Sequence, residues 1–471
     1  MGGHPKLLVI GLDSAPPALV FDRWANDLPA LSRLARTGLS GPLESTHPPI
    51  TIPAWSAMLS SRDPGELGCY GFRNRVSYQY GAYALATASD VRVDRVWDIL
   101  GRHGIRSVLL GVPQTFPPAP LYGEMVSCFL TPSLDSQFTY PPSLREEVCR
   151  VVREYLFDVE GFRTPDKVGL LARVYEKTRK HFELARYLIS SRPWDFFMTV
   201  EMGTDRIQHG FWRFMDPAHR KYEAGNPFEQ AIREYYQYVD QELSRLLALI
   251  PEDTRVLVVS DHGAKKMEGG ICVNEWLIRE GYLVLQEYPR TVTRPDGLAI
   301  DWARTTAWAE GGYYARVFLN VSGREPEGRV SPDAYERVRD ELIQGLRSIP
   351  DPDGRPLDTK VYRPEELYRT LRGVPPDLLV YFGDLAWRSV GSVGMRQLHV
   401  EENDTGPDDS NHDWHGIYIM AETGHDLGGL TSGVRPLYDI APTILAHFGL
   451  APQPEMIGRP FSPSAPASHR E

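Results

Sequence analysis

The chain has 471 residues, of which 42% are apolar and 24% charged, values that exclude a wholly disordered protein. The net charge of −11 argues against binding of duplex nucleic acid through a broad basic surface. No apolar run approaches the roughly 18 residues that cross a bilayer, so we expect no membrane span. The four cysteines form no CxxC pair, and we expect reduced thiols in a cytoplasmic protein.

Short β-type segments alternate with helical segments along the chain. The apolar runs at 6–12 and 255–260 are typical of strands that are buried on both faces of a parallel sheet. Further strands are expected at 106–111, 196–201, 315–321, 377–382 and 416–420, and helices at 28–37, 51–60, 96–102, 168–189, 332–348 and 437–448. The alternation predicts a three-layer α/β/α sandwich with a mostly parallel central sheet.

Two stretches fit this alternation less well. Residues 112–192 begin with a Pro-rich run and continue as a helical segment, and residues 283–400 are charged and Pro-rich with a helix of their own. We therefore expect one domain over residues 1–461, with these stretches as cap insertions that wall the functional site. The low-complexity residues 462–471 are expected to form a disordered tail.

Carboxylates and imidazoles, which bind transition metals, follow two of the predicted strands. Asp13 stands where the first apolar strand stops, and Asp261 and His262 directly follow the strand at 255–260. Open α/β sheets bind ligands in the crevice beyond the carboxyl ends of their strands. Each residue is also compatible with an ordinary turn or helix cap.

Two further segments offer ligands of the same kind. Asp205 and His209 are four residues apart, so on a helix both project from one face and could share a cation, or form an exposed ion pair. His412 and His415 precede the strand at 416–420, and their spacing alone does not show which of them is a ligand.

Thr51 is the candidate nucleophile. It opens the predicted helix at 51–60, where free N–H groups and the helix dipole favour an anion. A hydroxyl beside a divalent cation becomes a nucleophile at neutral pH. Thr is also a common helix cap, so this position alone allows both interpretations.

The order of these residues resembles that of the alkaline phosphatase superfamily. The resemblance is to its type I phosphodiesterase/nucleotide pyrophosphatase branch, and most closely to the predicted bacterial phosphohydrolase/phosphomutase group. It extends from about residue 6 to residue 461 and includes the supporting stretches 63–65, 323–328, 376–380, 439–445 and 458–459.

The resemblance implies two divalent metal ions and a covalent intermediate on Thr51. One metal would be held by Asp205, His209 and His412. The second would be held by Asp13, Asp261 and His262. Zinc is the expected metal, and the ligand types also accept manganese or iron.

The residues expected to bind the substrate differ from those of the relatives. Phe72 stands near the position where nucleotide pyrophosphatases carry a phosphoryl-binding Asn, and Asn74 or Arg75 could take that part or be plain loop residues. Trp212, close after His209, is a candidate pocket residue or a packing residue.

We therefore expect a metal-dependent hydrolase of a small phosphodiester or nucleotide-type substrate. A phosphomonoesterase or phosphomutase on the same scaffold is the alternative, although the related phosphoglycerate mutase uses Ser as its nucleophile. A sulfatase is disfavoured because Thr51-Ile52-Pro53-Ala54-Trp55 lacks the Arg of the sulfatase motif. A non-catalytic, metal-stabilised scaffold is disfavoured because every expected ligand is present. The sequence does not indicate an oligomeric state.

Overall fold

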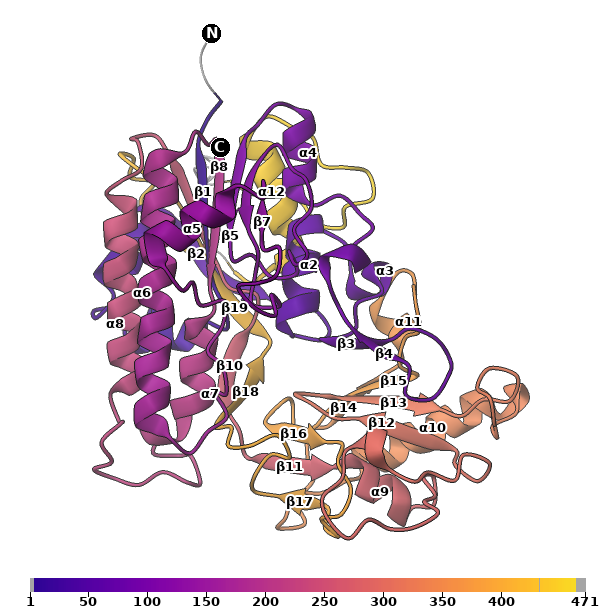
Figure 1. The fold of residues 1–471 in the computed structure, drawn as a ribbon. Coiled ribbons are helices and arrows are strands. Elements are labelled where there is room, and N and C mark those ends of the chain that lie inside the picture. The colour runs from indigo at the N-terminus through magenta and orange to yellow at the C-terminus, as the bar shows by residue number, and fades with distance from the viewer. Residues whose placement is uncertain (1–3, 432, 463–471) are drawn as a thin grey trace, which may run out of the picture.

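The structure is a computed structural model that describes residues 4–431 and 433–462 (Figure 1). Residues 463–471 of the expected tail lie outside the described residues. A ten-stranded central sheet has the order β20-β2-β19-β9-β1-β8-β5-β6-β7, with β21 paired to β2. Its strands are β1 (Leu7–Leu12), β2 (Leu39–Glu44), β5 (Ser107–Leu110), β6 (Gly123–Val126), β7 (Thr139–Tyr140), β8 (Phe196–Glu201), β9 (Arg255–Val259), β19 (His415–Glu422), β20 (Leu430–Thr431) and β21 (Arg435–Pro436).

The middle of the sheet is parallel and buried on both faces. Strands β9, β1, β8, β5 and β6 run parallel, whereas β19 pairs antiparallel with β9 and β2, and β7 pairs antiparallel with β6. Leu8 and Ile10 of β1 pack into one hydrophobic core, while Leu7 and Val9 pack into the other. This explains why the strand reads as a continuous apolar run.

Helices cover both faces of the sheet and complete a three-layer α/β/α sandwich (Figure 1). One layer consists of η1 (Ala18–Arg23), α1 (Pro29–Thr37), α5 (Leu144–Val152), α6 (Lys167–Ser191), α7 (Gly203–Met215) and α8 (Ala231–Leu247). The other consists of α2 (Thr51–Ser60), α3 (Pro64–Leu67), α4 (Val96–Arg102), η5 (Leu437–Asp439) and α12 (Ile440–His447). The predicted strand at 196–201 and helices at 51–60 and 96–102 are confirmed residue for residue.

Residues 112–192 are part of the sandwich, and the prediction that they form a cap is wrong. This stretch supplies β6 and β7 to the central sheet. Its long helix α6 buries Leu170, Val174 and Leu188 in the same core as β1 and β8. The Pro-rich run is therefore a connection between sheet strands, and the helical segment is one layer of the fold.

Residues 267–409, called here the small lobe, form a separate body beside the sandwich (Figure 1). They have their own hydrophobic core around an antiparallel sheet of order β12-β13-β15-β14. The lobe begins earlier than the predicted insertion at 283, because β11 and α9 belong to it. Its elements are β11 (Gly269–Cys272), α9 (Val273–Arg279), η3 (Pro295–Gly297), β12 (Ala307–Glu310), β13 (Ala315–Leu319), η4 (Pro332–Ala334), α10 (Tyr335–Arg347), β14 (Lys360–Tyr362), α11 (Pro364–Leu367), β15 (Leu378–Tyr381), β16 (Trp387–Val390) and β17 (His399–Val400).

Two antiparallel strands connect the small lobe to the sandwich. The chain leaves along β10 (Gly263–Lys266) and returns along β18 (Ser410–Asp413), and the two strands pair with each other. A hairpin of β3 (Arg73–Arg75) and β4 (Tyr83–Leu85), followed by η2 (Ala88–Asp90), extends from the sandwich toward the lobe (Figure 1). Within the described residues, the helices are too short or too polar to span a membrane.

Candidate metal centre and nucleophile

Three neighbouring strands of the central sheet end at one edge and deliver most of the predicted ligands there. Strand β1 lies between β8 and β9, and all three run parallel. Helix α7 begins directly after β8, and it is helical over the Asp–His spacing as predicted. The ligands brought to this edge are Asp13 after β1, Asp205 and His209 on α7, and Asp261 and His262 after β9.

His412 joins this group across the β10–β18 pair. The antiparallel register places His412 opposite Ala264, two residues beyond His262. The two imidazoles stack, with ring centroids 3.8 Å apart. His415 instead opens β19 opposite Glu44. The structure therefore places His412, and not His415, beside the other candidate ligands, a choice that the spacing in the sequence left open.

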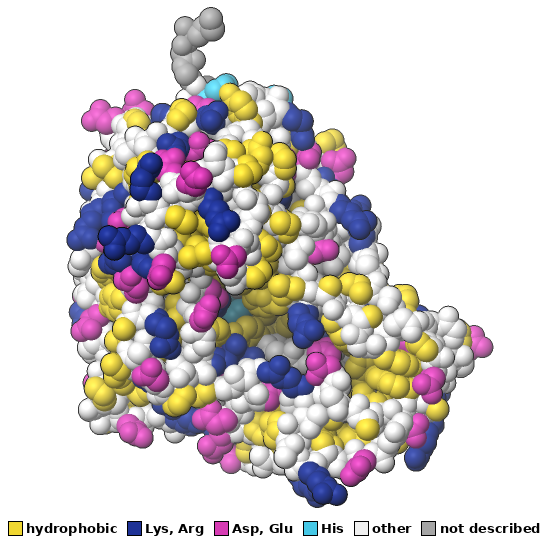
Figure 2. Space-filling view, viewed as in Figure 1, with side chains coloured by type: hydrophobic (Ala, Val, Ile, Leu, Met, Phe, Trp, Pro, Cys, Tyr) yellow, Lys and Arg dark blue, Asp and Glu magenta, His cyan; other side chains and the backbone are white. Residues whose placement is uncertain are grey.

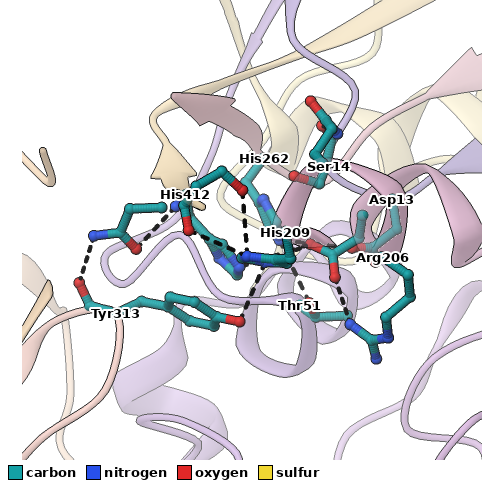
Figure 3. A network of polar contacts seen from close by, with 12 residues as sticks. Asp13, Ser14, Thr51, Arg206, His209, His262, Tyr313 and His412 are labelled. Carbon is teal, nitrogen blue, oxygen red and sulfur yellow. Dashed lines mark hydrogen bonds and ion pairs between the residues drawn. The ribbon is translucent and has the colours of Figure 1, made fainter. Parts of the chain in front are cut away.

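The ligand atoms fall into two overlapping groups of buried residues, Asp205 with His262 and His412, and Asp13 with Asp261 and His262, and His209 lies beside Asp205 of the first group (Figure 3). In the first, Oδ1 of Asp205 lies 3.1 Å from Nε2 of His209 and 3.8 Å from Nε2 of His412. In the second, Nε2 of His262 lies 3.2 Å from Oδ2 of Asp261 and 3.7 Å from Oδ1 of Asp13. His262 also stands within reach of Asp205 and His412, so the two groups share a border.

Hydrogen bonds orient all three imidazoles with Nε2 toward the centre. Nδ1 of His262 lies 2.9 Å from the carbonyl oxygen of Gly263, and Nδ1 of His412 lies 2.7 Å from that of Pro49. A carbonyl only accepts, so these Nδ1 atoms carry the proton and leave the Nε2 lone pair free. Nδ1 of His209 is held in the same way by a carboxylate.

Each of the three carboxylates has one oxygen held by the protein and one without a hydrogen-bond partner. Trp55 Nε1 donates to Oδ2 of Asp13 at 2.8 Å, Arg206 donates to Oδ2 of Asp205, and the Ser14 N–H donates to Oδ1 of Asp261 at 3.2 Å. The other oxygen of each is buried and lacks a hydrogen bond. Buried carboxylate oxygens left in this way are fitted to a cation.

The electrostatics of the cluster also fit bound cations. Burial, and then the nearby Asp205 carboxylate, raise the pKa of Asp13 to about 8, and burial and Asp13 raise the pKa of Asp261 well above its usual range. Burial lowers the pKa of His262 to about 4, so this imidazole is neutral. A divalent cation in the second group would compensate these carboxylates and use the neutral imidazole as a ligand. In the first group, against the effect of burial, His209 lowers the pKa of Asp205 well below its usual range and Asp205 raises the pKa of His209 well above its own, so these two residues form an ion pair that a cation would replace.

Thr51 lies beside this cluster at the N-terminus of α2. Its side chain is buried, and its Oγ1 lies 3.4 Å from Nε2 of His262. The preceding residue, Ile50, has an extended backbone conformation, so the helix begins at Thr51 itself. The N-terminus of α2, where backbone N–H groups lack partners within the helix, therefore lies beside the metal-ligand candidates.

The turn after β1 is built to aim Asp13. Gly11 leaves room for the Trp55 ring, because a Cβ at this position would lie 2.5 Å from a ring carbon. That approach allows the indole of Trp55 to hold Asp13. Ser14 then adopts a left-handed φ of 63°, a strained conformation for a residue with a Cβ, and its N–H meets Asp261.

Asp408 is a functional residue that the sequence analysis missed. It is buried, and its Oδ1 accepts from Nδ1 of His209 at 2.7 Å, while Oδ2 accepts from Arg163 Nε at 2.8 Å and from Arg388 Nη1 at 3.0 Å. A carboxylate on the far nitrogen of a ligating histidine fixes the orientation of the ring and raises its basicity. The acidic pair at 408–409, just before His412, was the available signal.

Tyr313 is a second residue that the sequence analysis missed, and it comes from the small lobe. Its hydroxyl lies 3.2 Å from Nε2 of His209 and accepts from Arg163 at 2.6 Å (Figure 3). Its ring stacks on His412 with centroids 3.9 Å apart. The small lobe thus places one phenol hydroxyl directly over the metal-binding groups.

The three residues proposed for the substrate do not join the cluster. Asn74 closes its own loop through Tyr70 and Gly71, so its amide is already used. Arg75 is buried in an ion pair with Glu325 of the small lobe. The structure therefore gives Asn74 a role within its own loop and Arg75 a joining role between the hairpin and the lobe.

Trp212 is likewise a packing residue in this structure. It belongs to the hydrophobic core between the helices and the sheet, and its indole N–H donates to Asp216 at 3.1 Å. Trp212 follows His209 closely in α7, but its side chain packs among the apolar residues of this core.

A cavity of about 540 Å³ opens beside the cluster, between the sandwich and the small lobe. Ile50, next to Thr51, and Tyr313, which touches His209, both line it. Figure 2 shows this hollow, with basic side chains around it and a histidine visible inside. A substrate held here would reach the hydroxyl of Thr51.

Comparisons with known proteins agree with this geometry. The sequence matches the type I phosphodiesterase/nucleotide pyrophosphatase family over residues 7–416. Human ectonucleotide pyrophosphatase/phosphodiesterase 5 is similar in structure, with a TM-score of 0.56 and 11% identity over 95% of this chain and 96% of that protein. The murine protein gives 0.56 and 10% over the same shares, and its inactive variant in complex with AMP gives 0.55 and 11% over 96% of each chain. No curated protein sequence matches the chain.

The fold and the two buried groups of ligands define an alkaline-phosphatase-like α/β protein with a candidate two-metal centre. The chain belongs to the type I phosphodiesterase/nucleotide pyrophosphatase family.

Proposed function

We propose that the protein is a two-metal phosphohydrolase that cleaves a phosphodiester or a nucleotide-type pyrophosphate through a covalent intermediate on Thr51. The observation that carries this proposal is the convergence of three buried, unpartnered carboxylate oxygens and three Nε2 atoms beside the Thr51 hydroxyl. Family membership and the AMP complex of the similar murine protein support a nucleotide-type substrate.

The two groups of ligands suit two divalent cations. Asp205, His209 and His412 would hold one, and Asp13, Asp261 and His262 would hold the other. The mixture of imidazole and carboxylate favours zinc. When bound, such ions lower the pKa of a nearby hydroxyl and neutralise the charge of the transferring phosphoryl group.

Thr51 performs the covalent step. Its Oγ1 gives its proton to solvent water and forms a bond to phosphorus, while the bond from phosphorus to the leaving oxygen breaks and its electron pair stays on that oxygen, which takes a proton from water. Water then attacks the phosphorus, the Oγ1–phosphorus bond breaks with its electron pair on Oγ1, and the proton lost by the attacking water restores the Thr51 hydroxyl.

Tyr313 and the start of α2 provide hydrogen-bond donors for the phosphoryl oxygens. The Tyr313 hydroxyl accepts from Arg163 and faces Nε2 of His209, so its proton would be free to point toward the substrate when that nitrogen holds a metal ion. The N–H groups at the beginning of α2 face the same region. In this proposal Tyr313 takes the part for which the sequence suggested Asn74 or Arg75.

The test compares zinc-loaded protein on bis(4-nitrophenyl) phosphate and on 4-nitrophenyl phosphate, each with and without a chelator. We expect chelator-sensitive turnover, with a higher kcat/KM for the diester. A higher kcat/KM for the monoester would assign the site to a phosphomonoesterase or phosphomutase instead. Turnover that survives complete removal of metal would contradict the two-metal proposal.

A further inference from the structure

The cavity beside Thr51 is unusually rich in arginine for a chain of net charge −11. Six arginines line it, together with only two carboxylates, Asp296 and Glu310. These arginines are Arg73, Arg163, Arg206, Arg294, Arg316 and Arg388. They come from the sandwich, the β3–β4 hairpin and the small lobe, so folding gathers them at one place.

Half of these arginines are already neutralised by the protein. Arg163 and Arg388 share the carboxylate of Asp408, and Arg206 pairs with Asp158 and Asp205. Their charge is used to hold the metal centre together, and they leave little attraction for a ligand.

The remaining three arginines have no carboxylate within 4.0 Å among residues 4–431 and 433–462, where the ion pairs are described. They are Arg73, Arg294 and Arg316. Arg73 and Arg294 are exposed at the rim of the cavity, whereas Arg316 is 92% buried on β13. A guanidinium so deeply buried requires an anion or hydrogen-bond acceptors.

Arg316 has only part of that requirement met by the protein. Its Nη1 donates to the carbonyl oxygen of Arg73. Glu310 stands opposite it in the β12–β13 register, and burial raises the pKa of this carboxyl. Arg316 in turn lowers the pKa of Glu310, but no carboxylate among the described residues lies within 4.0 Å of the guanidinium, so donors of Arg316 remain available to a ligand in the cavity.

We propose that this cavity binds a second phosphate group, carried by the substrate at some distance from the phosphorus that reacts. This inference rests on the proposed function, because it places the reacting phosphorus at Thr51 and the distal phosphate at Arg73, Arg294 and Arg316. Guanidinium groups bind phosphate through paired, charge-assisted hydrogen bonds. The cavity volume of about 540 Å³ accommodates a small organic bisphosphate.

The aromatic residues that line the cavity limit the chemical nature of the group that links the two phosphates of the substrate. Phe72 and Phe162 line the same cavity beside these arginines. The linking portion of the substrate therefore passes over apolar rings, while its two ends meet the metal ligands and the free guanidiniums. A substrate with a neutral distal end would leave Arg316 without an anion.

The experiment compares matched diesters that release the same 4-nitrophenolate. One carries a 3-hydroxypropyl arm, the second a 3-phosphopropyl arm, and the third a carboxylate arm of equal length. We expect kcat/KM for the phosphate arm to exceed that for the hydroxyl arm by at least tenfold. In Arg316→Met and in Arg294→Gln we expect this ratio to fall toward one, whereas the control Arg33→Gln, on a distant exposed site, keeps it.

Binding provides a readout that does not depend on turnover. We expect zinc-loaded protein to bind 1,3-propanediol bisphosphate at least tenfold more tightly than propyl phosphate, and Arg294→Gln to lose the difference. Equal affinities, or a difference that survives in both arginine variants, would overturn the inference even if the diesters are hydrolysed. A carboxylate arm as effective as the phosphate arm would overturn the assignment to phosphate. Failure to hydrolyse any of the diesters, with the binding difference intact, would contradict the proposed function alone.

Discussion

Replacing Asp408 by Asn should weaken metal binding although Asp408 touches no metal position. The amide can still accept from Nδ1 of His209, but it presents an N–H₂ group to Arg163 and Arg388, where the carboxylate had an acceptor. The His209 ring then loses its negative partner and its fixed orientation. Loss of such a partner lowers metal affinity about tenfold to hundredfold, which corresponds to about 1.4–2.7 kcal/mol.

The assay is a competitive titration of zinc against a chelator of known affinity. Asp409→Asn is the matched control, because Asp409 is the adjacent residue and is equally buried, but its nearest cation is Arg213 at 3.8 Å and it does not contact His209 through its side chain. We expect the control to bind zinc nearly as the unmodified protein does. An unchanged affinity in Asp408→Asn, or an equal loss in both variants, would refute this reasoning.

Three further outcomes follow from the geometry. The pKa of Asp13 is raised from 3.8 to about 8 in the metal-free protein, so the stability that Asp13 contributes is complete below pH 3.8 and is lost as the pH rises toward 8. The increase in Tm that zinc produces should therefore grow between pH 6 and pH 8, and an increase independent of pH would contradict this. Tyr313→Phe should lower kcat/KM about tenfold to hundredfold with unchanged zinc content, and equal activity would exclude Tyr313 as a donor. Gly11→Ala should displace Trp55 and lower the free energy of unfolding by about 1–3 kcal/mol, measured by urea denaturation, and an unchanged midpoint would show that the ring can move without cost.

The candidate metal ligands could be predicted because they depend on regular structure. Parallel strands bring their carboxyl ends to one edge of the sheet, so Asp13 and Asp261 converge wherever β1 and β9 are neighbours. Helical periodicity alone aligns Asp205 with His209. Thr51 could be placed because its helix begins at the residue that the sequence indicated.

The features that the sequence did not predict depend on tertiary contacts between irregular segments. Tyr313 lies between β12 and β13, and Asp408 lies in the segment that leads into β18, where no periodic pattern indicates their partners. The choice of His412 over His415 from the residues alone needed the β10–β18 register. Arg75 was a substrate candidate because it stands near the position of the phosphoryl-binding Asn of nucleotide pyrophosphatases, and its buried partner Glu325 is 250 residues away in the sequence.

The error at residues 112–192 has a physical reason as well. An amphipathic helix looks the same in sequence whether its apolar face covers a central sheet or a separate cap. Only the packing of Leu170 and Val174 against the sandwich core distinguishes the two. The segment at 283–400, by contrast, contains enough apolar residues to form its own core.

The central claim is that Thr51 forms the covalent intermediate between two metal ions. The most direct test is kcat/KM of zinc-loaded Thr51→Ala on bis(4-nitrophenyl) phosphate, with metal content measured on the same sample. We predict a loss of at least about a thousandfold with the zinc content unchanged, because the substitution removes the nucleophile and leaves the proposed metal ligands in place. A rate within tenfold of the unmodified protein at equal zinc content would contradict the claim.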